Sequence, residues 1–156
     1  MRILVEQVMT RGPIVIRRQQ DVHELEKLLL QRRIHGVPVV DEDDRLVGVA
    51  SQTDLLEWHF DAAVDGASFF SDAAADQAAA RRGLRLCDFR SASVEEVMSP
   101  VVHCIEASRP VEEAASAMIR NQIHRLVVVD EGGRVIGVIS AIDLLRLVPG
   151  AAELLA

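Results

Sequence analysis

The chain contains the same stretch of sequence twice. Twenty of the 52 residues in Val5–Leu56 recur, without a gap, 89 positions later in Val94–Leu145. A repeat of this kind is a structural unit that buries its apolar face against a neighbouring copy. The duplication therefore predicts two copies of one fold, packed with pseudo-twofold symmetry and with paired clefts where they meet.

Each copy has the same predicted order of elements: a short helical turn, a strand, a helix, a two-strand hairpin and a second helix. Near-continuous apolar runs at Val37–Val40 and Leu126–Val129 are typical of strands buried on both faces, beside a parallel neighbour. A polar turn of about four residues follows each run. Asp21 and Pro110 suit the first turn of the helix before the hairpin. Pro38 cannot donate a backbone hydrogen bond and predicts an edge or a strand start.

The segment between the copies has no counterpart inside them. We predict repeat 1 at residues 1–60, a helical connector at 61–92, repeat 2 at 93–150 and a tail at 151–156. Within the connector, Ser71–Gly83 has an N-capping serine, an alanine-rich body and a terminating glycine, which predicts a helix.

Charge and composition argue against several classes of function. The net charge of −7 repels nucleic acid, and one Trp with no Tyr offers no platform for stacking bases. No segment approaches the roughly 20 apolar residues that span a bilayer, and the N-terminus does not have a secretion signal. We expect a soluble, cytoplasmic protein that contacts neither nucleic acid nor membrane. Cys87 and Cys104 have no metal or disulfide spacing and are expected to be buried, reduced thiols.

The polar residues that repeat just after the hairpin are the strongest candidates for chemistry. Ser51 with Asp54, and Ser140 with Asp143, follow strands that end in G-V-A and G-V-I. Ser-x-x-Asp before an apolar run is a capping box, which satisfies free N–H groups of the helix. The same groups can bind a nucleotide, because a helix N-terminus attracts phosphate and an aspartate can accept hydrogen bonds from a ribose diol. Spacing alone does not choose between the two interpretations.

The whole repeat resembles the CBS domain, the cystathionine β-synthase motif that occurs in pairs called Bateman modules. The resemblance covers nearly everything outside the connector and the tail. It rests on V-M-T at Val8–Thr10 and V-M-S at Val97–Ser99, V-P-V-V-D at Val37–Asp41 and L-V-V-V-D at Leu126–Asp130, and the two stretches G-V-A-S-Q-T-D-L-L at Gly48–Leu56 and G-V-I-S-A-I-D-L-L at Gly137–Leu145.

The resemblance implies an α/β (α+β) fold of two β-α-β-β-α repeats and clefts for adenosine-containing ligands such as AMP, ATP, S-adenosylmethionine or NAD. None of these is expected as a required cofactor. By this resemblance the ribose would be held by Asp54 and Asp143, the phosphate would lie near Ser51 and Ser140, and the cleft entrance would carry Thr10 and Ser99.

The chain departs from the family pattern just before each aspartate. Many nucleotide-binding members have Arg or Lys there, whereas this chain has Thr53 and Ile142. Thr53 can donate to a phosphate and Ile142 cannot, so we expect two unequal clefts. The positive charge that binds a phosphate would have to come from other residues, and the candidates are Arg11, Arg125 and Arg134. The alternative is that these arginines are ordinary solvated surface residues.

We predict a regulatory module that binds an adenosine-type ligand and signals to a partner protein through a conformational change. The alternative is a ligand-free interaction or dimerisation scaffold, in which both Ser-x-x-Asp pairs serve only as helix caps. No catalytic constellation is present, so an enzyme is not expected. The repeated His35 and His124 have no partner at ligand spacing, so no metal site is expected. Leu30 and Ile119 widen the apolar stripes of their helices beyond one sheet face, which indicates contact with another helix, either of the sister repeat or of a second chain. We expect a homodimer.

Overall fold

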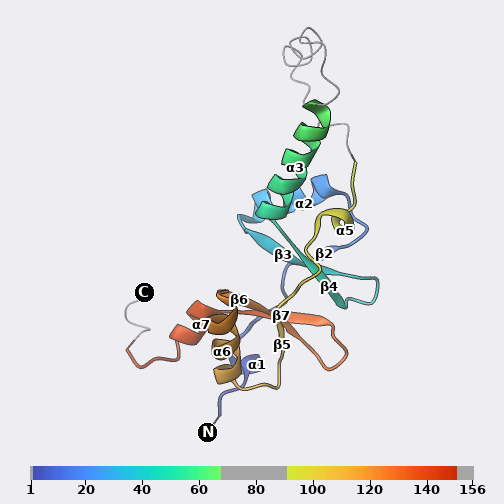
Figure 1. The fold of residues 1–156 in the computed structure, drawn as a ribbon. Coiled ribbons are helices and arrows are strands. Elements are labelled where there is room, and N and C mark those ends of the chain that lie inside the picture. The colour runs from blue at the N-terminus through green and yellow to red at the C-terminus, as the bar shows by residue number, and fades with distance from the viewer. Residues whose placement is uncertain (1, 68–90, 151–156) are drawn as a thin grey trace. The chain divides into compact units, whose positions relative to one another are not determined.

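The computed structural model describes residues 2–67 and 91–150 (Figure 1). The predicted connector helix at Ser71–Gly83 and the tail lie outside the described residues. The elements are α1 (Val5–Val8), β1 (Thr10–Arg11), β2 (Ile16–Arg17), α2 (Val22–Arg32), β3 (Gly36–Val40), β4 (Leu46–Ser51), α3 (Gln52–Ala67), α5 (Val94–Val97), β5 (Cys104–Glu106), α6 (Val111–Asn121), β6 (Arg125–Val129), β7 (Val135–Ser140) and α7 (Ala141–Leu145). The predicted mixed α/β fold is confirmed, and each repeat contains the predicted order of elements, with the two-residue strand β1 as an addition in repeat 1.

The chain folds into two compact units, and each unit uses residues of both repeats. Unit 1 comprises residues 1–15, 40–47 and 101–156, and unit 2 comprises residues 16–39 and 48–100. Unit 1 therefore combines α1 and β1 of repeat 1 with the three strands of repeat 2 and with α6 and α7. Unit 2 combines most of repeat 1 with α5 of repeat 2. The short helix that begins each repeat thus packs in the unit formed mainly by the other repeat.

Unit 1 is built on a four-stranded sheet in the order β1-β7-β6-β5. β5 runs parallel to β6, and β7 runs antiparallel to both β6 and β1. The parallel neighbour predicted for the apolar run of β6 is confirmed. Helices α1 and α6 pack on the same core, whose buried side chains are Val5, Met9, Ala114, Met118, Leu126, Val128 and Ile139.

Unit 2 has a three-stranded sheet in the order β2-β3-β4, so the prediction for Pro38 is wrong. Pro38 lies inside β3, the central strand, rather than at an edge or a strand start. The physical reason is the length of the neighbour. β2 has only two residues beside the five of β3, which leaves positions of β3 without a ladder partner on that side, and a proline is tolerated there.

Helices α2 and α6 begin at the residues predicted from the sequence. Asp21 is the N-cap of α2, and its carboxylate accepts a hydrogen bond from the backbone N–H of His23 at 2.8 Å. Pro110 is the N-cap of α6. The strands before these helices are shorter than the apolar runs suggest. The run at residues 14–16 contributes only Ile16 to β2.

The prediction that Cys104 is buried is also wrong. Cys104 was predicted to be buried, but it is a free and exposed cysteine at the start of β5. β5 is the edge strand of the sheet in unit 1, and the side chain of its first residue points away from the core side chains. An apolar sequence pattern does not distinguish the two faces of an edge strand.

Candidate functional site

In unit 1 the sheet register brings Thr10 to the candidate residues of repeat 2. Thr10 on β1 lies directly opposite Val138 on β7. Directly paired residues project from the same face of a sheet, and so do residues two apart on one strand. Thr10, Val138 and Ser140 therefore share a face. The Cβ atoms of such a diagonal pair, here Thr10 and Ser140, are separated by about 7 Å.

Unit 2 repeats this arrangement with the roles of the repeats exchanged. Ser99 forms an antiparallel bridge with Val49, and each backbone N–H donates to the carbonyl oxygen of the other residue at 2.9 Å. By the same alternation, Ser99 shares a face with Val49 and Ser51. The predicted site residues thus form two groups: Thr10, Ser140 and Asp143 in unit 1, and Ser51, Thr53, Asp54 and Ser99 in unit 2.

Both Ser-x-x-Asp pairs form the capping box that was one of their two interpretations. Asp54 Oδ2 accepts hydrogen bonds from the backbone N–H of Ser51 at 2.6 Å and from its hydroxyl at 2.5 Å. Asp143 Oδ2 accepts the same pair from Ser140 at 2.8 Å and 2.6 Å. Each box occupies one carboxylate oxygen, so capping does not by itself use the whole carboxylate.

The second oxygen of each carboxylate has a different environment. Among the described residues, no group donates a hydrogen bond to Asp54 Oδ1. Arg146 Nη1 lies 3.4 Å from Asp143 Oδ1. Both aspartates are half-buried. Asp54 can therefore accept a ligand hydroxyl directly, whereas Asp143 would share its free oxygen with an exposed arginine.

The residues before the aspartates also differ as the sequence indicated. Thr53 and Ile142 are both exposed, and 53% of the Ile142 side chain is accessible. One site therefore presents a hydroxyl group where the other presents an alkyl group.

Of the three arginines considered as sources of charge, Arg125 lies on the candidate face. It pairs directly with Ser140 across β6 and β7, so its side chain projects from the face that also carries Thr10. Arg11 pairs with Gly137 and therefore projects from the opposite face, where its guanidinium donates to the Glu6 carbonyl oxygen at 3.2 Å. Arg134 lies in the turn before β7.

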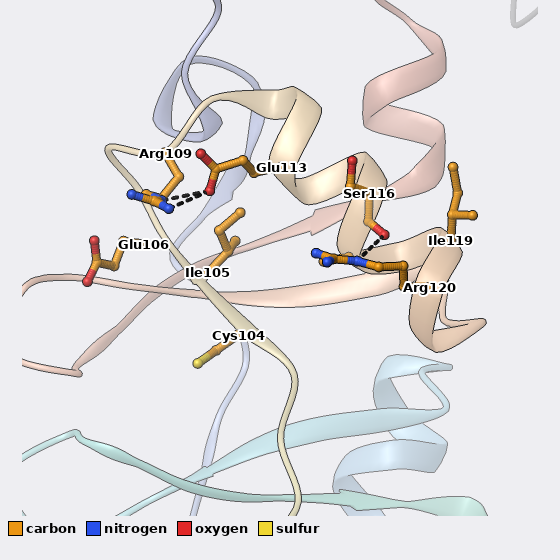
Figure 2. Close-up of a pocket in the computed structure, with 9 residues that line it drawn as sticks. Cys104, Ile105, Glu106, Arg109, Glu113, Ser116, Ile119 and Arg120 are labelled. Carbon is orange, nitrogen blue, oxygen red and sulfur yellow. Dashed lines mark hydrogen bonds and ion pairs between the residues drawn. The ribbon is translucent and has the colours of Figure 1, made fainter.

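A separate open groove of about 970 Å³ lies in unit 1 between β5 and α6 (Figure 2). Two of its charged side chains, Arg109 and Glu113, form an ion pair at 2.7 Å, and Arg120 Nε donates to the Ser116 carbonyl oxygen at 3.3 Å. None of the predicted site residues lines it. Sequence reasoning did not single out this groove, although the i,i+4 spacing of Arg109 and Glu113 indicates their ion pair.

Within residues 2–67 and 91–150, no three His, Cys, Asp or Glu side chains are arranged to hold a metal ion. Within the same ranges, every helix is too short or too polar to cross a bilayer.

The sequence profile of one protein family, the CBS domain, matches residues 5–61 and again residues 94–150. The chain belongs to the CBS domain family. Its two matched segments coincide with the two copies of the repeat, and the match leaves the segment between them outside the family pattern. The boundaries we predict at residues 60, 92 and 150 remain predictions.

One relative of similar length matches this chain along most of its sequence. A CBS domain-containing protein of Dictyostelium discoideum is 32% identical over 147 residues, which are 94% of this chain and 92% of that protein. Two solved structures share the fold at 24% sequence identity. CBSX2 in complex with AMP has a TM-score of 0.68 and covers 98% of each chain. The CBS domain pair of protein MJ0100, in complex with 5′-methylthioadenosine and S-adenosyl-L-methionine, has a TM-score of 0.64 and covers 94% of this chain and 96% of that chain.

Other relatives are much longer, and some are enzymes. The chain matches only 23% of the L-aspartate semialdehyde sulfurtransferase and of the inosine-5′-monophosphate dehydrogenase of Methanocaldococcus jannaschii, at 25% identity in each case. The CBS domains therefore form the part that this chain has in common with those enzymes.

Proposed function

We propose that this CBS domain protein is a non-catalytic regulatory module that binds an adenosine-containing ligand and signals to a partner protein in the cytoplasm. The observation that supports the proposal most strongly is the hydrogen-bond register between the strands of each unit. In each unit it sets a hydroxyl residue of one repeat on the same sheet face as the Ser-Asp pair of the other. The complexes of CBSX2 with AMP and of MJ0100 with two adenosine derivatives support the choice of ligand class.

The proposed contacts follow from which atoms remain available. Asp54 Oδ1 and Asp143 Oδ1 would accept hydrogen bonds from the ribose hydroxyls, while Oδ2 of each stays in its capping box. The hydroxyls of Thr10 and Ser99 would donate to polar groups of the ligand from the facing strand. The half-buried valines on the same faces, Val49 and Val138, would pack against the adenine ring.

A regulatory role requires that the ligand favour one conformation over another, because a ligand shifts an equilibrium only by its difference in affinity for the two states. Each site joins segments that are distant in the sequence, such as Thr10 and Ser140 in unit 1. A ligand bound there would stabilise the association of these segments. The partner protein would then distinguish the ligand-bound form from the free form.

Calorimetric titration with AMP, ATP, S-adenosylmethionine and NAD tests the proposal. Wild-type protein should bind at least one of them, and Asp54→Ala combined with Asp143→Ala should abolish binding. The matched control is Glu96→Ala, because Glu96 accepts the backbone N–H of Ser93 at 2.6 Å in a similar box at α5 that lies outside both groups of site residues. Absence of binding to all four ligands at millimolar concentration would refute the proposal.

A scaffold function remains the second candidate, and one observation favours it. Leu30 on α2 and Ile119 on α6 occupy equivalent positions in the two repeats, and the residues are 73% and 77% exposed. Leu56 and Phe60 add exposed apolar surface on α3. Exposed apolar side chains at corresponding positions suit a surface that meets a second copy. We propose that these helix faces form a homodimer whether or not a ligand is bound.

A further inference from the structure

The charged residues around the two candidate aspartates, Asp143 and Asp54, differ between the units. In unit 1, Asp143 is accompanied by Arg125 and Arg146. The positions equivalent to these two arginines in the other repeat are Gly36 and Glu57, beside Asp54 in unit 2. Around Asp143 there are therefore two cations and one carboxylate, whereas around Asp54 there are two carboxylates and neither arginine.

Arg125 is free to contact a ligand. It is exposed and lies directly opposite Ser140, at a position where paired Cβ atoms are about 5 Å apart. Among the described residues, its guanidinium has no hydrogen-bond or ion-pair partner, in contrast to Arg109, which is bound to Glu113. Arg146 is 64% exposed and reduces the negative charge near Asp143 from the other side.

The equivalent position in unit 2 lies equally close to the site but has no side chain. A Cβ atom at Gly36 would lie 3.4 Å from the Cβ of Ser51, so a residue there is a direct neighbour of the capping serine. Glu57 is exposed and follows Asp54 by three positions on α3, which places the two carboxylates on neighbouring surface of the helix. Thr53 is the uncharged donor on this face.

The adjacent histidines do not change this comparison. His35 and His124 occupy the same position in the two repeats, so they contribute no difference between the faces. His35 Nδ1 lies 3.1 Å from Gln52 Oε1. The distinction between the units therefore rests on Arg125 and Arg146 against Gly36 and Glu57.

We propose that the two units select adenosine ligands of different charge. Unit 1 takes a ligand with an anionic group such as a 5′-phosphate, with Arg125 as the residue that determines specificity. Unit 2 takes an uncharged or cationic adenosine derivative. This inference rests on the proposed function, and it makes the protein a sensor of two ligands rather than of two molecules of one ligand. An arginine hydrogen bond to a phosphate is one of the stronger polar contacts in proteins, whereas two carboxylates repel the same group.

Single-site variants test the inference by calorimetric titration with AMP and with adenosine. The Asp54→Ala variant keeps only the site of unit 1 intact. This site should bind AMP at least about tenfold more tightly than adenosine, and the preference should fall as the salt concentration is raised. Asp143→Ala leaves the site of unit 2, which should bind AMP no more tightly than adenosine. Adding Arg125→Ala to Asp54→Ala should remove the AMP preference and keep adenosine binding. Arg109→Ala in the same background is the control and should change neither affinity.

Two substitutions at exposed positions provide a second test if an aspartate variant is unstable. In otherwise wild-type protein, Arg125→Glu should weaken AMP binding at one of two sites, and Glu57→Arg should strengthen it at the other. If the wild-type protein binds none of AMP, ATP, S-adenosylmethionine, NAD and adenosine, the proposed function fails together with this inference. If it binds another of these ligands but neither AMP nor adenosine, this inference alone is wrong. If both ligands bind, but the ratio of their affinities is the same at the two sites or is unaffected by Arg125, this inference alone is wrong.

Discussion

The Sδ atom of Met9 fills the space beside Gly137 that a side chain would otherwise occupy. A Cβ atom at Gly137 would lie 2.7 Å from Met9 Sδ and 2.9 Å from the carbonyl oxygen of Thr10. In unit 2, Gly48 has the same relationship to Met98 and to the carbonyl oxygen of Ser99. Gly48 and Gly137 thus allow the segment that begins the other repeat to lie against the strand and to place Ser99 or Thr10 in the candidate site.

Gly137→Ala should destabilise the protein by about 1–3 kcal/mol, because the new methyl group forces a backbone carbonyl as well as a flexible methionine to move. The free energy of unfolding in urea measures the effect. Gly132→Ala is the control, since its nearest neighbour is a side-chain oxygen of Asp130 at 3.3 Å. Equal stability of Gly137→Ala and the wild type would show that β1 does not hold this close approach in solution.

Met118→Ala should lower the free energy of unfolding by about 2–5 kcal/mol, because Met118 is 4% exposed in the core shared by α1, α6 and the sheet. Ser116 lies on the same helix and is exposed, so Ser116→Ala should change stability by less than about 0.5 kcal/mol. A small effect of Met118→Ala would mean that α6 is loosely packed on the sheet.

Asp21 should make stability depend on acid pH. The hydroxyl of Ser91, at 2.7 Å, and the backbone N–H of His23 stabilise the carboxylate and hold its pKa below the ordinary value of 3.8. A carboxylate with a lowered pKa in the folded state stabilises the fold above the unfolded-state pKa, and this contribution is lost as the pH falls through the folded-state value.

The expected result is that Asp21→Asn flattens the fall in stability from roughly pH 5 to pH 2 relative to the wild type, measured by urea unfolding at each pH. Asp61→Asn serves as the control, because Asp61 is an exposed carboxylate on α3. If Asp21→Asn and Asp61→Asn gave the same pH profile, the hydrogen bonds of Asp21 would not stabilise its ionised form.

Substitution of Leu30 or Ile119 by Glu should weaken the proposed homodimer by at least tenfold. Burial of one such side chain stabilises an interface by about 1.5–3 kcal/mol, and a charge in its place opposes association. Light scattering at micromolar concentration should show the wild type as a dimer and these variants as increasingly monomeric. Gln31→Glu adds the same charge at an adjacent exposed position and should leave the dimer intact. A monomeric wild type would contradict the proposal.

Much of the fold could be predicted because its signals are local. The apolar run of β6, the turn after it and the helix cap at Asp21 depend on neighbours within a few residues, and each was found where the pattern placed it. The two interpretations of Ser51 and Asp54 were also local, and the capping box among them is present. Pro38 was misassigned because its tolerance depends on the length of β2, which is a property of a different segment.

The sequence by itself determined that one structural unit occurs twice, with the order of its elements and the local Ser-Asp pairs. Only the tertiary structure decided that Thr10 joins Ser140 and Ser99 joins Ser51, and that Arg125 shares the face of the first group whereas Arg11 does not. The physical reason is that hydrogen-bond register between strands is set by the packing of segments more than 120 residues apart in one case and nearly 50 in the other. A one-residue change in that register would turn every side chain to the opposite face, and no local pattern specifies it.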